Sequence, residues 1–133
     1  MNRTVFFDDN DAVLRSAKNF GINDLILDVG IGFGKKLNHN ITLIKQLKEF
    51  QKHNYEILIA ASRKSMINDI TPCEIEDRLS GTLAIHLEAI KNGATLVRCH
   101  DVKEHFQAIK VQEAILSKRN FWFIMNDLEF IKS

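Results

Sequence analysis

Three short apolar runs, each leading into polar residues, constrain the fold of this chain more than any other feature. They are residues 25–27 (LIL), 57–61 (ILIAA) and 94–97 (ATLV). The runs are continuous rather than alternating, which is typical of strands that are buried on both faces of a parallel sheet. The sequence therefore predicts an α/β fold in which parallel strands are covered by helices.

The segments between these runs have apolar residues at helical spacing and are predicted as helices: 9–20, 41–50, 71–92 and 102–116. Asn40 is the expected N-cap of the second helix. Thr71 and Pro72 are typical of a helix start, because threonine can cap and proline fits the first helical position. In the last helix, Phe106 and Ile109 are expected to face the core.

Composition argues against several classes of protein. Lys+Arg is 18 and Asp+Glu is 17, for a formal net charge of +1, so no broad basic surface for nucleic acid or membrane is expected. No apolar run approaches the roughly 20 residues of a spanning helix, and the start of the chain lacks the apolar core of a signal peptide. Cys73 and Cys99 are too few for a disulfide scaffold or a zinc site. We predict one domain that is soluble and cytoplasmic.

The first apolar run ends at Asp28, which a glycine-rich loop follows, residues 29–34 (VGIGFG). Glycines allow positive φ and close approach of the backbone to a ligand. A carboxylate beside them can accept two N–H donors from a flat heterocycle, and Phe33 can line or stack against such a ring. The alternative is a turn whose glycines serve geometry alone. The loop is not a P-loop, because no GK(S/T) sequence follows it, and it lacks the GxGxxG spacing of a dinucleotide-binding motif.

The second run leads into residues 62–65 (SRKS), with two cations and two hydroxyl groups. A lysine just after a buried strand can hydrogen-bond a ligand or stabilise a developing negative charge. Alternatively, Arg63 and Lys64 are solvated loop charges, and one of the two is expected to be.

The third run leads into Arg98 and His100, which lie two residues apart and point to the same side of an extended segment. Arginine presents a planar fork that matches phosphate oxygens, and histidine can donate a hydrogen bond or a proton. The pair predicts a site for phosphate or pyrophosphate. The alternative is an Arg98–Asp101 ion pair, and Asp101 is also a candidate N-cap of the last helix.

In parallel sheets the functional groups sit at the carboxyl ends of the strands, so these three polar segments are expected to meet at one rim. The other ionisable groups are expected to be structural. His86 lies on an amphipathic helix and is expected to be partly buried, whereas His39, His53 and His105 are expected at the surface. Cys99 points away from its neighbours Arg98 and His100 and is expected in the core.

Taken together, these segments resemble the dihydropteroate synthases of the pterin-binding family. The matching stretches are LDVGIGFGK (27–35), SRKSMI (62–67), RLSGTLA (78–84) and GATLVRCHDVKE (93–104). The likeness covers residues 9–117 in the right order. Two departures are that the family usually has proline where Val29 stands and commonly valine where Cys99 stands.

The resemblance implies a (β/α)₈ barrel that condenses a dihydropterin pyrophosphate with p-aminobenzoate and releases pyrophosphate. Asp28 would hold the amino-pyrimidine edge of the pterin, and Gly32 and Phe33 would shape its pocket. Lys64 would contact the pterin and border the p-aminobenzoate site, with Ser62 near that second substrate. Arg98 would lie over the pterin and, with His100, hold the pyrophosphate. By the resemblance, Lys64, Arg98 and His100 form the catalytic set.

The length of the chain is the larger departure. A (β/α)₈ barrel takes about 250 residues, whereas this chain has 133 and three clear strands. We predict a single incomplete pterin-binding domain over residues 1–133, made of the C-terminal βα units of the barrel, with residues 118–133 unassigned. The resemblance also implies Mg²⁺, whose protein ligand is not expected in this chain, and a homo-oligomer or a complementing N-terminal chain.

Two alternatives stay open. A methyltetrahydrofolate methyltransferase shares the pterin-binding barrel, but it has no pyrophosphate for Arg98 and His100 to hold. An inactive remnant, or a module that only binds pterin or a partner chain, would retain the fold without the reaction.

Overall fold

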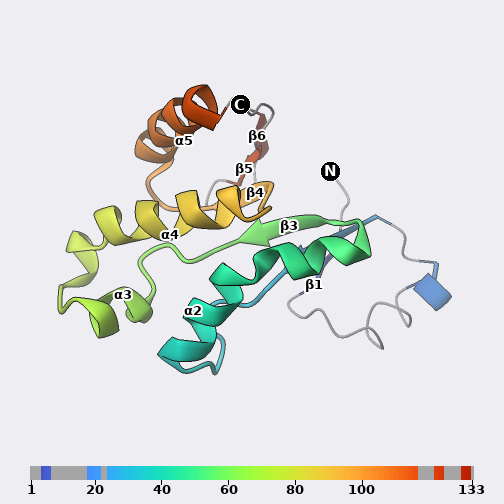
Figure 1. Ribbon diagram of the computed structural model, residues 1–133, viewed down its shortest axis with the longest axis horizontal. Helices are drawn as coiled ribbons and strands as arrows, with labels where there is room; N and C mark the ends of the chain where they lie inside the picture. The colour runs from blue at the N-terminus through green and yellow to red at the C-terminus, as the bar shows by residue number, and fades with distance from the viewer. Residues whose placement is uncertain (1–3, 7–17, 22–23, 117–121, 125–129, 133) are drawn as a thin grey trace.

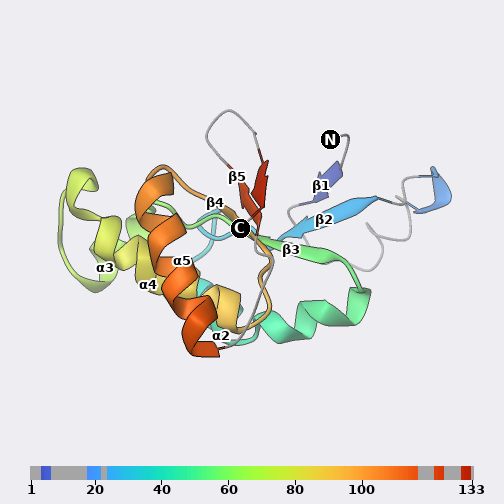
Figure 2. The ribbon, with the colours of Figure 1, turned by 90° about the horizontal axis from the view of Figure 1, so that it is seen from above.

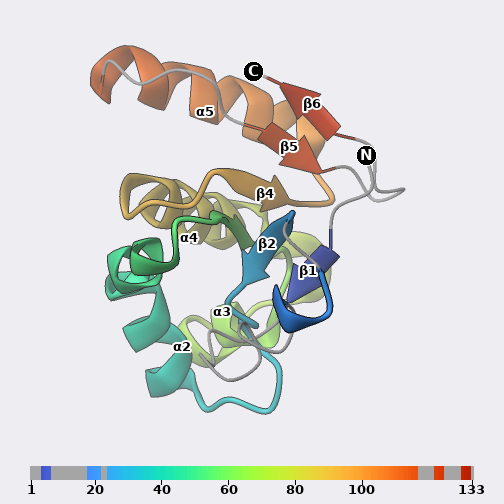
Figure 3. The ribbon, with the colours of Figure 1, turned by 90° about the vertical axis from the view of Figure 1, so that its right-hand side faces the viewer.

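A computed structural model describes residues 4–6, 18–21, 24–116, 122–124 and 130–132 of the chain. The described strands form one sheet whose order follows the chain: β1 Thr4–Phe6, β2 Leu25–Asp28, β3 Glu56–Ile59, β4 Leu96–Arg98, β5 Trp122–Ile124 and β6 Phe130–Lys132. Neighbours from β1 to β5 are parallel, and β6 is antiparallel to β5. Among the described strands, β1 and β6 do not pair with each other, so the sheet is an open, curved segment rather than a closed barrel (Figure 3).

The predicted fold class is confirmed, and the sheet is larger than expected. The three apolar runs form β2, β3 and β4, whereas β1, β5 and β6 were not predicted. Each of these three strands, like β4, has only three residues, and in such short apolar runs periodicity cannot distinguish a strand from a helix. The helices are α2 Leu37–Lys45, η1 Leu47–His53, α3 Ser65–Ile70, η2 Ile75–Asp77, α4 Leu79–Lys91 and α5 Val102–Leu116. Helices α2 to α5 pack against the same face of the sheet (Figures 1 and 2).

The start of α2 differs from the sequence prediction. The helix begins at Leu37, with Lys36 in the cap position, and Asn40 is a buried residue inside it rather than its N-cap. The side chain of Asn40 instead accepts a hydrogen bond from the amide of Gly32, at 3.1 Å. A tertiary contact with the glycine loop has replaced the expected local one.

The start of α4 also differs. Thr71 is the C-cap of the short helix α3, which was not predicted. The chain then turns, because the amide of Cys73 donates to Asn68 Oδ1 at 2.9 Å. Helix α4 begins only at Leu79. The Thr71–Pro72 signal was therefore wrong: it lies at the end of one helix rather than at the start of the next.

Helix α5 has the predicted bounds, but one of its core residues was wrong. The buried residues His105, Ile109 and Glu113 are four apart, which places them on one face of the helix. Phe106 is turned away from that face and is 42% exposed. The predicted first helix, 9–20, falls mostly outside the described residues. Of its residues the structure describes 18–20, and 18 and 19 are helical.

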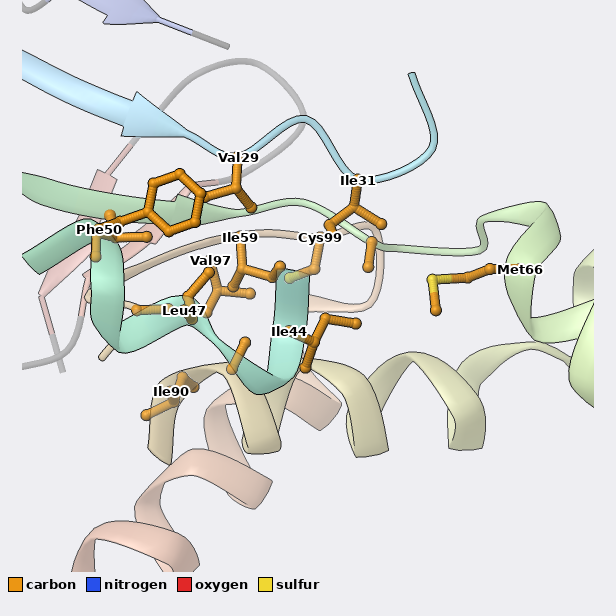
Figure 4. Packing of buried hydrophobic residues seen from close by; sticks show 14 of the residues in the cluster. Val29, Ile31, Ile44, Leu47, Phe50, Ile59, Met66, Ile90, Val97 and Cys99 are labelled. Atoms are coloured by element: carbon orange, nitrogen blue, oxygen red, sulfur yellow. The ribbon is translucent and has the colours of Figure 1, made fainter. Parts of the chain in front are cut away.

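The two faces of the sheet have different roles. Residues such as Ile59, Val97 and Cys99 face the helices and form the main core with Ile44 and Ile90 (Figure 4). Cys99 is 1% exposed, as predicted for a core residue. The opposite face carries a second buried cluster made by Ile26, Leu58 and Leu96. Because side chains alternate along a strand, Asp28, Ala60 and Arg98 continue this second face toward the carboxyl ends.

The close packing of α3 on α4 allows a test of this core. A Cβ added at Gly81 would lie 2.6 Å from Cγ2 of the buried Ile67. Gly81→Ala is expected to lower the free energy of unfolding by about 1 kcal/mol, because overpacking outweighs the gain in helix propensity. Urea denaturation would measure it, with Ser80→Ala, at an exposed position of the same helix, as the control within about 0.5 kcal/mol of wild type. A stabilised Gly81→Ala variant would contradict the packing described here.

Candidate functional site

A cavity of about 240 Å³ lies at the carboxyl ends of β3 and β4. Its lining residues come from the end of β4 and from the segments that follow the two strands: Ala60, Ser62, Lys64, Arg98, Cys99 and His100. The alternation along the strands explains why Ala60 and Ser62 line it together, and likewise Arg98 and His100, because the members of each pair are two residues apart. The predicted meeting of strand ends is thus present in the structure.

Ser62 and His100 join the two segments directly. The Oγ of Ser62 lies 2.7 Å from Nδ1 of His100, and the amide of His100 donates to the same Oγ at 3.1 Å. Burial lowers the pKa of His100, and the nearby charges of Arg63, Arg98 and Lys64 lower it further against the opposing effect of Asp101. The neutral form of the imidazole is therefore favoured, in a positive field that also favours an anion.

Arg63 has a structural part in this site. Its φ is 58°, in the left-handed region that residues other than glycine seldom adopt. Three contacts hold it there: its amide donates to Thr82 Oγ1 at 3.0 Å, its carbonyl accepts from Arg78 Nη1 at 2.9 Å, and its Nη2 donates to Asp101 Oδ1 at 3.1 Å. The turn directs the next residue, Lys64, to the cavity.

The ion pair between Arg63 and Asp101 bears on two alternatives raised by the sequence, the roles of Asp101 and of Arg63. Asp101 pairs with Arg63 rather than with Arg98. Its other oxygen, Oδ2, is buried without a hydrogen-bond partner among the described residues, so the carboxylate does not cap α5. Arg63 is accordingly not the solvated loop charge that one member of the Arg63–Lys64 pair was expected to be.

Asp28 places a carboxylate beside these cations. The side chain is buried, and its Oδ1 accepts a hydrogen bond from the amide of Gly30 at 2.8 Å. Burial raises the pKa of Asp28, while the Gly30 amide and the charges of Lys64, Arg98 and Lys35 act in the opposite direction. The carboxylate is therefore close enough to Lys64 and Arg98 to share one electrostatic environment with them.

The glycine loop lies over Lys64. The Nζ of Lys64 is 4.9 Å from the centroid of the Phe33 ring, a cation–π distance. A Cβ on Gly32, whose φ is +85°, would lie 3.3 Å from Cδ of Lys64. The positive φ thus favours glycine at this position, and a Cβ would press on the stem of the lysine.

The structure therefore gathers all of the site residues that the sequence singled out: Asp28, Gly32, Phe33, Ser62, Lys64, Arg98 and His100. Sequence reasoning missed Asn40, which anchors the amide of Gly32, and Lys35, whose Nζ donates to the carbonyl of Gly30 at 3.1 Å. Nothing in the local pattern distinguishes Asn40 from a helix cap. His105, expected at the surface, is fully buried beneath the site.

Two kinds of site are not seen in the described part of the chain. No group of three or more His, Cys, Asp and Glu side chains there is arranged to hold a metal ion. Among the same residues, no helix has the length and apolar character required to cross a membrane.

These observations define a class of protein: a parallel α/β barrel segment whose strand ends carry a buried carboxylate beside a cation-lined cavity. Comparison with known sequences narrows the class. The family model described as "Pterin binding enzyme" matches residues 6–100, and the chain belongs to this family. The chain is 44% identical over 110 residues to a Helicobacter pylori protein named bifunctional dihydropteroate synthase/dihydropteroate reductase. It is 46% identical over 95 residues to the dihydropteroate synthase of Escherichia coli K12.

These alignments cover 83% and 71% of this chain but only 28% and 34% of the two relatives, so the chain spans about a third of their length. Solved dihydropteroate synthase structures superpose on this chain and likewise extend beyond it. The Yersinia pestis dihydropteroate synthase superposes with a TM-score of 0.80 at 33% identity, over 87% of this chain and 58% of that one. The Xanthomonas albilineans enzyme in complex with 7,8-dihydropteroate superposes with a TM-score of 0.77 at 33% identity, over 83% of this chain and 45% of that one.

Proposed function

We propose that this chain contributes one wall of a dihydropteroate synthase site. The reaction would condense a dihydropterin pyrophosphate with p-aminobenzoate to give dihydropteroate and pyrophosphate. The single observation that carries the proposal is the meeting of Asp28, Lys64 and the Arg98–His100 pair at one set of strand ends. The relatives named dihydropteroate synthase support it, as does the X. albilineans structure with 7,8-dihydropteroate.

The pterin is assigned to Asp28 and the glycine loop. One oxygen of Asp28 already accepts the amide of Gly30, and each carboxylate oxygen has more than one lone pair, so the group can still accept N–H donors from an amino-pyrimidine edge. Gly32 keeps the loop close to Lys64, and Phe33 supplies an aromatic wall.

The leaving group is assigned to Arg98 and His100. The aniline nitrogen forms a bond to the exocyclic methylene carbon while the carbon–oxygen bond breaks, pyrophosphate departs with the bonding electron pair, and the nitrogen then releases a proton to solvent. Negative charge grows on the departing oxygen, and the guanidinium, the imidazole and Lys64 stabilise it more in the transition state than in the ground state. Ser62 holds His100 in place and borders the second substrate.

The cations at the cavity favour the synthase over a methyltetrahydrofolate methyltransferase, whose substrate has no pyrophosphate. Mg²⁺ is implied by the resemblance alone. Among the described residues, no group of three or more His, Cys, Asp and Glu side chains is arranged to hold a metal ion, and the proposed steps do not pass through a metal. A second chain, either another copy or a complementing N-terminal segment, is proposed to supply the remaining walls of the site. The cytoplasmic location also stays a prediction.

An assay on the purified chain tests the proposal. Dihydropterin pyrophosphate, p-aminobenzoate and Mg²⁺ would be supplied, and pyrophosphate release measured across protein concentrations. Turnover that rises more steeply than linearly with chain concentration is the expected result for a site completed by a second copy. Binding of the pterin substrate without turnover at any concentration would favour a binding module instead, and the absence of both would contradict the proposal.

Asp28→Asn is expected to weaken binding of the pterin substrate by about tenfold or more, because an amide presents a donor where the ligand also presents donors and a buried group is left unsatisfied. The substitution is expected to preserve the local fold, since an asparagine Oδ1 can still accept a hydrogen bond from the amide of Gly30. Calorimetric titration with a 6-substituted pterin would measure the loss. Unchanged affinity would remove Asp28 from the site.

A further inference from the structure

Two buried histidines lie behind the site and have no part in the proposed chemistry. His86 belongs to α4 and His105 to α5, helices that lie side by side (Figure 1). Both side chains are fully buried. Nδ1 of His86 is 2.8 Å from Nε2 of His105, and the ring centroids are 4.9 Å apart.

The outer contacts of the pair determine where its hydrogens are. The amide of Ala61 donates to Nε2 of His86 at 2.9 Å, so that nitrogen carries no hydrogen. Nδ1 of His105 lies 2.8 Å from the carbonyl oxygen of Asp101, which only accepts, so that nitrogen carries one. His86 must then donate from Nδ1 to the lone pair on Nε2 of His105. Both rings are neutral, and both carry their hydrogen on Nδ1.

The relay ends on the two segments that form the cavity. Ala61 directly precedes Ser62, and Asp101 directly follows His100. Ser62 and His100 are themselves hydrogen-bonded at the front. The two segments are therefore joined twice, by side chains at the mouth of the cavity and by the histidine relay behind it.

Apolar residues could fill the same space between the helices without fixing a distance. Hydrogen bonds are directional, and a chain of three, two of them buried and the one to Asp101 partly buried, has a set length. Each buried donor that lost its partner would cost free energy, so the relay opposes any shift that lengthens it. The spacing it maintains is that between the Ser62–Lys64 turn and the Arg98–His100 segment.

We propose that His86 and His105 are positioning residues, whose relay sets the distance between the lysine and the arginine–histidine groups of the anion site. The effect on ligand binding rests on the proposed function, whereas the positioning itself does not. No covalent step is involved, and neither histidine is among the residues that line the cavity.

The test uses the full chain and begins with the tautomers. Long-range ¹H–¹⁵N correlation spectra at pH 7.5 are expected to show His86 and His105 as neutral rings with hydrogen on Nδ1, the minor form of free histidine. A ring with hydrogen on Nε2 alone, or an imidazolium, would overturn the relay. This measurement requires no ligand and no variant.

Variants then separate positioning from stability. His86→Leu fills the volume but removes both hydrogen bonds, whereas His86→Gln keeps an acceptor and a donor. In His86→Leu the pKa of His100, followed by NMR without ligand, is expected to move back toward 6.5, and pyrophosphate affinity to fall by about tenfold, in line with the cost of small misplacements. In His86→Gln, the pKa of His100 and the pyrophosphate affinity are both expected to stay close to their wild-type values.

Ile90→Val, a buried change on the same helix, is the control. It is expected to lower stability by about 1 kcal/mol and to leave the pKa of His100 and pyrophosphate affinity unchanged. A folded His86→Leu variant with the wild-type pKa at His100 would overturn the proposal. If His86→Leu does not fold, the proposal is tested by the tautomers in the wild-type spectra and by the His100 pKa in His86→Gln. If wild type does not bind pyrophosphate, the proposed function fails, while the tautomers and the His100 pKa still test the positioning.

Discussion

Replacing Arg98 with alanine is expected to weaken pyrophosphate binding by about ten- to a hundredfold. Arg98 lines the cavity, and its planar fork can form charge-assisted hydrogen bonds to phosphate oxygens, which contribute about 1.5–3 kcal/mol. Calorimetric titration of the purified chain with pyrophosphate, at fixed salt concentration, would measure the loss.

Arg63→Ala is the matched control, because it removes the same charge from the same region. Its guanidinium is engaged with Asp101, so a smaller loss of pyrophosphate affinity is expected. The long-range electrostatic change is similar in the two variants, and the difference between them reports direct contact with the anion. Equal losses would contradict the assignment of Arg98 as the direct contact with the anion.

Acidification from pH 7 to pH 5 is expected to lower the free energy of unfolding by about 2 kcal/mol through His86 alone. Burial, with a further contribution from His105, lowers the pKa of His86 to about 3. The folded state therefore binds fewer protons than the unfolded state between pH 3 and pH 6.5, so the stabilisation is complete above the ordinary histidine pKa and is lost as the pH falls below it. Urea denaturation at several pH values in this window measures the slope.

Other ionisable groups also affect the slope of the free energy of unfolding against pH. Burial also lowers the pKa values of His105 and His100, in the same direction as His86, while Asp101 and Glu104 act on His105 in the opposite sense. The raised pKa of Asp28 acts with opposite sign at lower pH, which is why the window ends at pH 5. His86→Gln, which does not titrate, is expected to show a clearly shallower slope than wild type. An identical slope would contradict a neutral buried His86.

The candidate site was more predictable than the fold around it. Arg98 and His100 are two residues apart in a short extended segment, so their common direction follows from strand geometry, as does the opposite direction of Cys99. The arrival of Asp28 and Lys64 at the same rim follows from the parallel arrangement of continuous apolar strands.

Elements that depend on distant contacts were not predictable. Asn40 looks like a helix cap and is instead an anchor for Gly32. Thr71 and Pro72 carry the signal of a helix start, yet the hydrogen bond from Cys73 to Asn68 turns the chain there. His105 has the sequence surroundings of a surface residue and becomes buried because His86 supplies a hydrogen-bond partner 19 positions away.

The sequence alone determined the parallel α/β class, the three central strands and the groups at their carboxyl ends, because apolar runs and the twofold alternation of side chains are local properties of the chain. Only the tertiary structure decided which polar groups become partners. The Arg63–Asp101 pair joins residues 38 positions apart, and a hydrogen bond between such distant residues depends on a distance of a few ångströms that only the packing of the helices on the sheet establishes.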